Sequence, residues 1–410
     1  MQFTRLLRNP SVTVRAMAEA AAEKTSSRVS GREVIFIHDT SELVMGGPRA
    51  RASGYGPVGK GGRLGGVLLH PALAMDAQNG TLYGLVDLQI WNRDTGLAGP
   101  RRDRPTSEKE SQRWIDATAQ AGQVLASAAQ ITGVSDRESD IFEHFARRPA
   151  NVQLIVRACQ DRRIKVDEDN ERLFAFVDAL SEQGRFVVNI PAAPGRKART
   201  AELAVRFSAV LLTKPKHSAA KDLPGTVDLT MVDIKETSRP EGVEPVHWRL
   251  LTTHAVTNLG EARRIVDLYR MRWNIEEFFR TLKTAGFNIE DADISDPKPM
   301  INLVAAATVA AVTVMQLVKA RDGTTHQSLE EAFDPMDQPI LEAVSRDVEG
   351  KTERQQNPHP KGSLAFAAWV VARLGGWTGY YGKPGPKVMK IGLQEFQAIK
   401  YGALLRIRDV

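Results

Sequence analysis

This chain of 410 residues has little cysteine, few long apolar runs and only a small excess of charge of one sign. Cys159 is the only cysteine, which excludes an intrachain disulfide and a multi-cysteine zinc site and suits a reducing cytoplasm. The most apolar stretch, residues 303–318, is rich in alanine and threonine and too short for a comfortable membrane span, so a buried helix is predicted. Lysine and arginine exceed the acids by only 6, which permits a polyanionic partner without identifying one.

What the sequence does contain is a cluster of polar residues at helical spacing. Tyr269, Arg272, Glu276 and Lys283 fall within about 60° of one another when each residue advances by about 100°, as on an α-helix. A solvated helix edge with an i,i+4 pair of Arg272 and Glu276 would also produce this spacing. A carboxylate among cations is equally typical of a metal and phosphate site, so the spacing alone leaves both interpretations open.

Two further acids follow apolar runs that read as buried strands. Asp39 comes after residues 34–37, and Asp136 comes after residues 131–135. Between them the pattern predicts a hairpin of strands 65–74 and 81–91 and then a helix at 108–129. In this order of strand, hairpin, helix and strand, the first and fourth strands can lie side by side, which would bring Asp39 and Asp136 together.

The three acids and the four-residue spacing together resemble a known family. The spacing Y-x2-R-x3-E-x6-K, the box I-x-D-T-S around Asp39 and the box D-R-E-x-D at residues 136–140 resemble the DDE transposases of the insertion-sequence-4 family, the group that includes the transposon-five enzyme. Segments 8–10, 108–111 with Trp114, and 362–376 extend the resemblance over nearly the whole chain.

The resemblance implies an α/β fold. It consists of a ribonuclease H-like core, a mixed five-stranded sheet with flanking helices, which is interrupted by a β-rich insertion and followed by an α-helical C-terminal domain. Strands predicted at 154–157, 186–190, 201–212 and 227–235 fit the insertion, and the strand predicted at 246–253 fits either the insertion or the core. Helices predicted at 298–319, 328–332, 340–348 and 363–374 fit the later part. The expected divisions are an N-terminal helical remnant at 1–30, core at 31–150, insertion at 151–245, core at 246–320 and a helical dimerisation region at 321–410.

The resemblance also implies the chemistry: metal-dependent DNA nicking, hairpin formation and strand transfer at insertion-sequence ends. Three carboxylates form an oxygen-only site that suits Mg²⁺, with Mn²⁺ as a substitute. Two ions would share Asp39, one adding Asp136 and the other Glu276. The expected partners are double-stranded DNA, as transposon end and target, and a second copy of the chain in the DNA complex. A bacterial cytoplasmic, nucleoid-associated protein with no nucleotide cofactor and no membrane contact is expected.

By the same resemblance, Tyr269, Arg272 and Lys283 grip the DNA end, Trp248 stacks on an extruded base and Arg157 contacts its phosphate. A strand tryptophan is otherwise typical of a core, and Arg157 also fits an ordinary surface arginine. Glu138 and Asp140 are interpreted as ion-pair partners behind the site, with Arg137. The buried-strand histidines His38 and His70 are interpreted as structural or as supporting groups behind the acids, because neither has a Ser or Cys partner. The basic residues of the insertion are interpreted as DNA-backbone contacts: Arg196, Lys197, Arg199, Lys214, Lys216 and Lys221.

Two other functions are compatible with the sequence. Family members carry a DNA-recognition domain before the Arg-Asn-Pro segment, which here lies at residues 8–10, so the sequence resembles an N-truncated form. Such a form could act as a non-catalytic inhibitor through dimerisation. A cellular nuclease on the same core is the third reading, but plain hydrolysis needs no hairpin-holding residues such as Trp248 and Tyr269.

Overall fold

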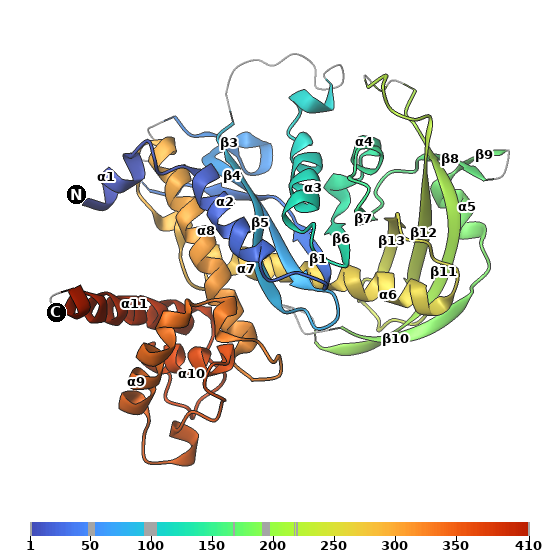
Figure 1. Cartoon of the computed structure of the whole chain (residues 1–410). Helices are drawn as coiled ribbons and strands as arrows, with labels where there is room; N and C mark the ends of the chain where they lie inside the picture. Colours follow the sequence, from blue (N-terminus) through green and yellow to red (C-terminus); the bar gives the residue numbers. More distant parts are fainter. Residues whose placement is uncertain are drawn as a thin grey trace. The chain divides into compact units, whose positions relative to one another are not determined.

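The computed structural model describes residues 2–47, 54–93, 105–166, 169–190, 197–216, 218 and 220–408 (Figure 1). Their contacts divide the chain into two compact units. Unit 1 consists of Met1–Val34, Thr40–Gly96 and Asn274–Val410, and unit 2 consists of Ile35–Asp39 and Leu97–Trp273. Each unit is therefore assembled from segments that are distant in the sequence.

Unit 2 is built on a mixed sheet. Its strands follow the order β1-β6-β7-β13-β12-β11-β8-β9, and β10 pairs with β11. The pairing of β6 with β7 is parallel, whereas β7 with β13, β13 with β12 and β12 with β11 are antiparallel. The strand bounds are β1 Glu33–His38, β6 Gln130–Ser135, β7 Val152–Arg157, β8 Arg163–Val166, β9 Asp169–Arg172, β10 Gly184–Ile190, β11 Arg199–Thr213, β12 Thr226–Glu236 and β13 His247–Thr252.

Helices of unit 2 pack on this sheet. α6 contacts β6 and β11, and α3 contacts β7 (Figure 1). α3 buries Trp114, Ala117 and Ala121 on one face, as a helix with an apolar stripe should. α6 begins at an N-cap, Asn258, whose side chain accepts the amide of Glu261. The helix bounds are η3 Thr106–Glu108, α3 Gln112–Val124, η4 Arg137–Ser139, α4 Phe142–Ala146, α5 Leu173–Ala179, α6 Leu259–Arg270 and η5 Met271–Trp273.

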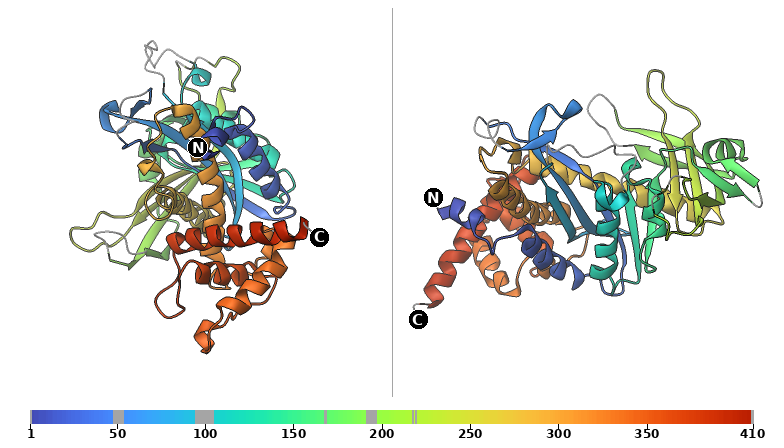
Figure 2. Two further views of the ribbon diagram at one scale, coloured as in Figure 1. Left: turned by 90° about the vertical axis from the view of Figure 1, so that its left-hand side faces the viewer. Right: turned by 90° about the horizontal axis from the view of Figure 1, so that it is seen from above.

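Unit 1 contains a smaller antiparallel group of strands around β4. This strand pairs with β2, β3 and β5. Helices α2 and α8 pack on β5 and on each other (Figure 2). The buried Gln316 amide of α8 donates to the backbone oxygens of Tyr83 and Glu331, which fastens α8 to β5. The bounds are α1 Gln2–Arg8, α2 Val14–Ser26, β2 Ser41–Val44, β3 Gly56–Val58, η2 Lys60–Gly62, β4 Leu64–Asp76, β5 Leu82–Trp91, α7 Asn274–Lys283, η6 Ile289–Asp291 and α8 Pro297–Ala320.

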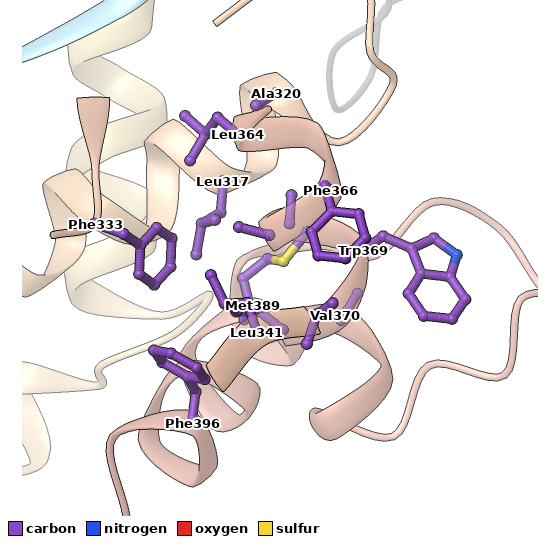
Figure 3. Packing of buried hydrophobic residues seen from close by; sticks show 14 of the residues in the cluster. Leu317, Ala320, Phe333, Leu341, Leu364, Phe366, Trp369, Val370, Met389 and Phe396 are labelled. Atoms are coloured by element: carbon purple, nitrogen blue, oxygen red, sulfur yellow. The ribbon is translucent and has the colours of Figure 1, made fainter. Parts of the chain in front are cut away.

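The C-terminal helices share one apolar cluster within unit 1 (Figure 3). The end of α8 contributes Leu317, α10 contributes Phe366 and α11 contributes Met389 and Phe396. A Cβ on Gly392 of α11 would lie 1.7 Å from the backbone oxygen of Val371, so α10 and α11 touch backbone to backbone there. The remaining bounds are η7 Leu329–Glu331, η8 Pro335–Asp337, α9 Gln338–Val348, η9 Glu353–Gln355, α10 Leu364–Leu374 and α11 Pro386–Arg408.

Helix α8 coincides with the apolar stretch found in the sequence. By length and composition alone it could cross a membrane, but most of its apolar window is buried inside the structure. A core helix passes the same test, and burial of this kind is what the alanine-rich and threonine-rich composition predicted.

The predicted strands and long helices are found within a few residues of their expected bounds. The helix expected at 108–129 is shorter, because α3 spans Gln112–Val124. Residues 328–332, expected to be helical, form only the 3₁₀ turn η7. The sequence reading missed the short strands β2, β3, β8 and β9, the helices α4 and α5, and the long helix α11.

Candidate active site

The first two acids follow neighbouring strands of unit 2. β1 ends at His38 and β6 ends at Ser135, so Asp39 and Asp136 are each the next residue. β1 and β6 are adjacent in the sheet, as the order of elements predicted. Glycine at position 133 of β6 permits this approach, since a Cβ there would lie 2.5 Å from the ring of Phe36 on β1. The backbone thus brings two carboxylate-bearing strand ends to one edge of the sheet.

The turn after β6 holds the Asp136 carboxylate. Its Oδ1 accepts the backbone N–H of Glu138 at 2.8 Å, and the Ser139 hydroxyl donates to the Asp136 backbone oxygen at 2.8 Å. Behind this turn, His144 Nδ1 lies 3.2 Å from the Ser139 backbone oxygen, and its Nε2 lies 2.8 Å from the Thr118 hydroxyl. Burial lowers the pKa of His144 to about 4, so the ring is neutral at pH 7, donates from Nδ1 and accepts at Nε2.

Glu138 and Asp140, the other acids of the box, are both in ion pairs. Arg113 Nη2 lies 2.5 Å from Glu138 Oε2, and Arg162 Nε lies 2.7 Å from the fully buried Asp140 Oδ1. Asp140 also accepts the backbone N–H of Cys159 at 2.9 Å. The two acids therefore act as ion-pair partners, as the sequence suggested, but their arginines come from α3 and from the loop after β7. Arg137, expected to take part, is exposed.

Asp39 is paired with a signature residue, Arg272. The Arg272 Nη1 atom lies 2.8 Å from Asp39 Oδ2, and the two side chains are only 11% and 13% exposed. A cation thus already lies against one of the oxygens proposed to hold a metal. Neighbouring Tyr269 is buried, and burial raises the pKa of its phenol, against the opposing effects of Arg272 and Arg157.

The helix carrying the signature is not one continuous α-helix, and this corrects the sequence reading. Tyr269 lies in α6, Arg272 lies in the 3₁₀ turn η5, and Glu276 and Lys283 lie in α7. A 3₁₀ turn advances about 120° per residue instead of about 100°, so three such residues shift the later positions by about 60°. The single narrow stripe calculated for an ideal helix therefore does not hold.

Glu276 and Lys283 belong to unit 1. Glu276 is exposed in the first turn of α7, whose first residue, Asn274, accepts a hydrogen bond from the half-buried Lys319 at 2.7 Å. Burial lowers the pKa of Lys319, while Glu277 opposes that shift. Lys283 Nζ donates to the Glu42 backbone oxygen at 2.6 Å, which fastens the end of α7 to β2.

The donor set is chemically suited to a hard divalent cation. Asp39, Asp136 and Glu276 offer only carboxylate oxygens, the ligands that Mg²⁺ and Mn²⁺ prefer. The guanidinium against Asp39 shows that this carboxylate lies where a positive charge is accommodated. Among the described residues, however, no three His, Cys, Asp or Glu side chains form a group that could hold a metal ion. Asp39 and Asp136 lie in unit 2 and Glu276 lies in unit 1.

The predicted DNA contacts of unit 2 lie close to Tyr269 or along the insertion strands. The half-buried Trp248 of β13 packs edge to face on Tyr269, with ring centroids 5.4 Å apart. Arg157, at the end of β7, donates to the backbone oxygen of His247 at 3.2 Å. Trp248 thus has an aromatic packing partner, and Arg157 is half-buried instead of lying free on the surface.

The basic residues of the insertion differ from one another. Arg199 forms an ion pair with the buried Glu236, so it is a structural residue and not an available phosphate contact. Lys214 Nζ donates to the Leu223 backbone oxygen at 3.3 Å. Lys216 and Lys221 are exposed, as is Lys197, whereas Arg196 lies outside the described residues.

Two residues near the acids were not singled out from the sequence. Arg113 forms an ion pair with Glu138. Trp273 is 57% exposed, and the Arg272 guanidinium lies 5.5 Å from the centroid of the Trp273 ring. The segment 108–111 with Trp114 resembles the family, but its sequence does not indicate what these residues do. The two histidines fit their structural interpretation: His38 is buried against Trp114, and His70 is buried with Nδ1 2.9 Å from the Thr40 hydroxyl.

The family model of the transposase DDE domain matches residues 107–311 of this chain. The matched range is half of the chain and includes Asp136, Trp248, Tyr269, Arg272, Glu276 and Lys283. It begins after Asp39, so the first acid rests on the sequence box and on the adjacency of β1 and β6.

Proposed function

We propose, on the premise that this chain belongs to the transposase DDE domain family, that it is a transposase of the insertion-sequence-4 type. Its substrate is DNA, as the family implies. The proposed reactions are metal-dependent nicking of the element ends, hairpin formation and strand transfer into a target. The signature Tyr269, Arg272, Glu276 and Lys283 is the sequence feature that favours this type over other DDE transposases.

One observation carries the proposal: two acids emerge from adjacent strands, and a signature residue contacts one of them. Asp39 follows β1, Asp136 follows β6, and Arg272 reaches Asp39 at 2.8 Å. The three motifs are separate in the sequence, and in unit 2 the strands before Asp39 and Asp136 are neighbours and Arg272 contacts Asp39. A chance resemblance of short motifs gives no reason for this contact.

We assign Asp39, Asp136 and Glu276 as the ligands of divalent metal ions. When bound, Mg²⁺ or Mn²⁺ lowers the pKa of the attacking water or 3′-hydroxyl and stabilises the leaving oxygen. The chain's own cations position the strand: Arg272 offers a planar guanidinium fork to a phosphate, and Lys283 offers an ammonium group. For Arg272 this role requires that it leave Asp39, and for Lys283 that it leave the Glu42 carbonyl.

Aromatic residues supply the proposed stacking surface for an extruded base. Trp248 is half-buried and packs edge to face on the buried Tyr269, which supports it from beneath. Trp273 presents an exposed indole beside Arg272. Stacking on such rings contributes about 1–3 kcal/mol per base. Arg157, beside the Trp248 strand, is proposed to contact the phosphate of the same nucleotide.

The contact between two copies of the chain is proposed to lie in residues 321–410. Apolar side chains of α11 remain exposed in the single chain, among them Ile391, Ile399 and Leu405. A homodimer that holds two DNA ends would cover them.

The experiment that tests the proposal is a cleavage and strand-transfer assay of the purified chain on uncut and precut element-end duplexes. The reaction is run with Mg²⁺, with Mn²⁺ and with EDTA. Glu276→Ala is the matched variant, because its side chain is exposed and its loss leaves no core cavity. We expect cleavage with either metal, none with EDTA and a loss of at least about 1,000-fold in the variant.

Asp39→Ala and Asp136→Ala should give the same loss while leaving DNA binding intact. Glu277→Ala, one position along α7 and also exposed, is the control and should cleave like the wild type. Full activity in any of the three acid variants would remove that residue from the assignment. Cleavage that persists in EDTA would refute the metal-dependent mechanism.

A further inference from the structure

Arg113 lies at the start of α3 with its guanidinium turned into unit 2. Its side chain is 10% exposed, its Nη1 donates to the Glu110 backbone oxygen at 2.7 Å, and its Nη2 lies 2.5 Å from Glu138 Oε2. Burial lowers the pKa of Arg113, whereas Glu138, Glu110, Asp39 and Asp136 act in the opposite direction. The charge of Arg113 is therefore felt by both acids that follow β1 and β6.

A short series of contacts leads from Arg113 to the Asp136 carboxylate. Arg113 holds the side chain of Glu138, and the backbone N–H of Glu138 donates to Asp136 Oδ1 at 2.8 Å. Glu138 thus binds Arg113 through its side chain and Asp136 through its main chain. Glu138 therefore connects the Arg113 guanidinium to the turn that orients Asp136.

The next residue of α3 contacts the other strand end. The Trp114 ring lies 4.8 Å from the ring of His38, the last residue of β1 and the neighbour of Asp39. The Arg113 guanidinium lies 5.2 Å from the centroid of the same indole. The first turn of α3 therefore supports both strand ends, one through Glu138 and the other through His38.

We propose that Arg113 is a positioning residue for the metal-dependent reaction: it fixes the turn that orients Asp136 through its ion pair with Glu138. This inference rests on the proposed function. Partners of metal ligands that act in this way commonly contribute 10–100-fold to metal affinity. Segment 108–111 leads directly into the first turn of α3, which carries Arg113 and Trp114, so the proposal gives this segment a role.

The test measures Mn²⁺ binding to the full chain by electron paramagnetic resonance, alongside cleavage. Arg113→Met removes the charge but keeps the length of the side chain. We expect it to bind Mn²⁺ about 10–100-fold more weakly and to cleave correspondingly more slowly at fixed metal. Arg113→Lys, which can still form an ion pair with Glu138, should recover most of the affinity. A residue with a purely structural role would alter thermal stability but not Mn²⁺ affinity.

Two further variants define the route of the effect. Glu138→Gln keeps the backbone N–H that Asp136 accepts but weakens the pair with Arg113, so it should lose affinity as well. If the two residues act through each other, the double variant should lose no more than Arg113→Met alone. The control is Arg147→Met, because Arg147 forms a comparable but exposed ion pair with Asp222 in the same unit, and its affinity should equal the wild-type value.

The outcomes separate this inference from the proposed function. If the wild type binds Mn²⁺ in a manner that Asp136→Ala abolishes, and Arg113→Met and Glu138→Gln bind equally well, the positioning role is refuted and the proposed function stands. If the wild type shows no Asp136-dependent binding, both are refuted. If Arg113→Met fails to fold, Glu138→Gln provides the test, because the Glu138 side chain is 62% exposed and its replacement leaves the core intact.

Discussion

At the residue scale, Arg272 and a divalent cation compete for the same carboxylate. Arg272 lies 2.8 Å from Asp39, and both side chains are nearly buried, so the metal must displace a guanidinium before it can use that oxygen. Arg272→Met should therefore tighten Mn²⁺ binding to the DNA-free chain, by about tenfold if the lost competition is worth about 1.4 kcal/mol. The same variant should cleave DNA more slowly, because the phosphate loses its guanidinium. Mn²⁺ titration and single-turnover cleavage measure the two effects.

Arg270→Met is the control for this competition, since Arg270 pairs with Asp267 on the more exposed side of α6 and does not contact an acid of the site. Its Mn²⁺ affinity should be unchanged. An unchanged affinity in Arg272→Met would refute the competition, and a weaker affinity would show that the pair holds Asp39 in place for the metal.

A second residue-scale prediction concerns pH. His144 is buried and neutral with a pKa of about 4 in the folded chain, against an ordinary value of 6.5. Between those values the unfolded chain binds more protons, so the stabilising contribution is complete above pH 6.5 and is lost as the pH falls towards 4. The loss is up to about 3 kcal/mol. His254, also about 4 through burial and Arg264, adds to the same window.

Urea unfolding between pH 7.5 and 4.5 measures this dependence. His144→Gln retains a donor and an acceptor for Ser139 and Thr118, and its unfolding free energy should fall less steeply with acidification than that of the wild type. A curve parallel to the wild-type curve would show that His144 does not titrate in this range.

The positions of Asp39 and Asp136 at strand ends were predictable because each follows a short apolar run typical of a buried strand. Their adjacency followed from the order of elements. The partners Arg113 and Arg272 were not predictable as partners, because each contact depends on how a helix end packs against the sheet. Nothing in the spacing of the sequence distinguishes Arg113 from an exposed helical arginine.

At the element scale, the signature segment shows where an ideal helical wheel fails. The apolar positions Ile275, Phe278 and Leu282 correctly indicated a helix and are buried in α7. The 3₁₀ turn η5 has no such signature, because it contains neither proline nor glycine. The strands missed by the sequence reading are short, and β9 is exposed along its whole length, so it has no alternation to detect.

The contact between α10 and α11 gives an element-scale prediction with an internal control. A Cβ at Gly392 would meet the Val371 backbone oxygen at 1.7 Å, and a backbone atom cannot move aside cheaply. Gly392→Ala should therefore force the helices apart and destabilise the chain by about 1–3 kcal/mol. Gly402→Ala lies in the same helix with nothing within 4 Å and should stabilise it by up to about 1 kcal/mol. Thermal unfolding of both variants measures the difference, and equal changes would refute the close contact.

At the scale of the whole molecule, the chain passes between the two units several times. Unit 1 contains residues before and after the segment that carries Asp39, whereas unit 2 contains Ile35–Asp39 and then resumes at Leu97. The divisions expected from the resemblance are consecutive stretches of the sequence, whereas the two units group residues by their contacts. β7 illustrates this, since it begins at Val152 and pairs in parallel with β6 directly across the expected division at 151.

The chain carries a net charge of +6, and the salt dependence of DNA binding can show whether affinity depends on this overall charge or on particular lysines. Lys216 and Lys221 are exposed in unit 2, and if each neutralises a phosphate, replacing both by alanine should reduce the slope of log affinity against log salt by about 2. The control is Lys351→Ala with Lys387→Ala, which removes the same charge from exposed positions of unit 1. Filter binding over a range of salt concentrations compares the two. A slope reduced equally in both would mean that overall charge, and not contact by the insertion, determines the affinity.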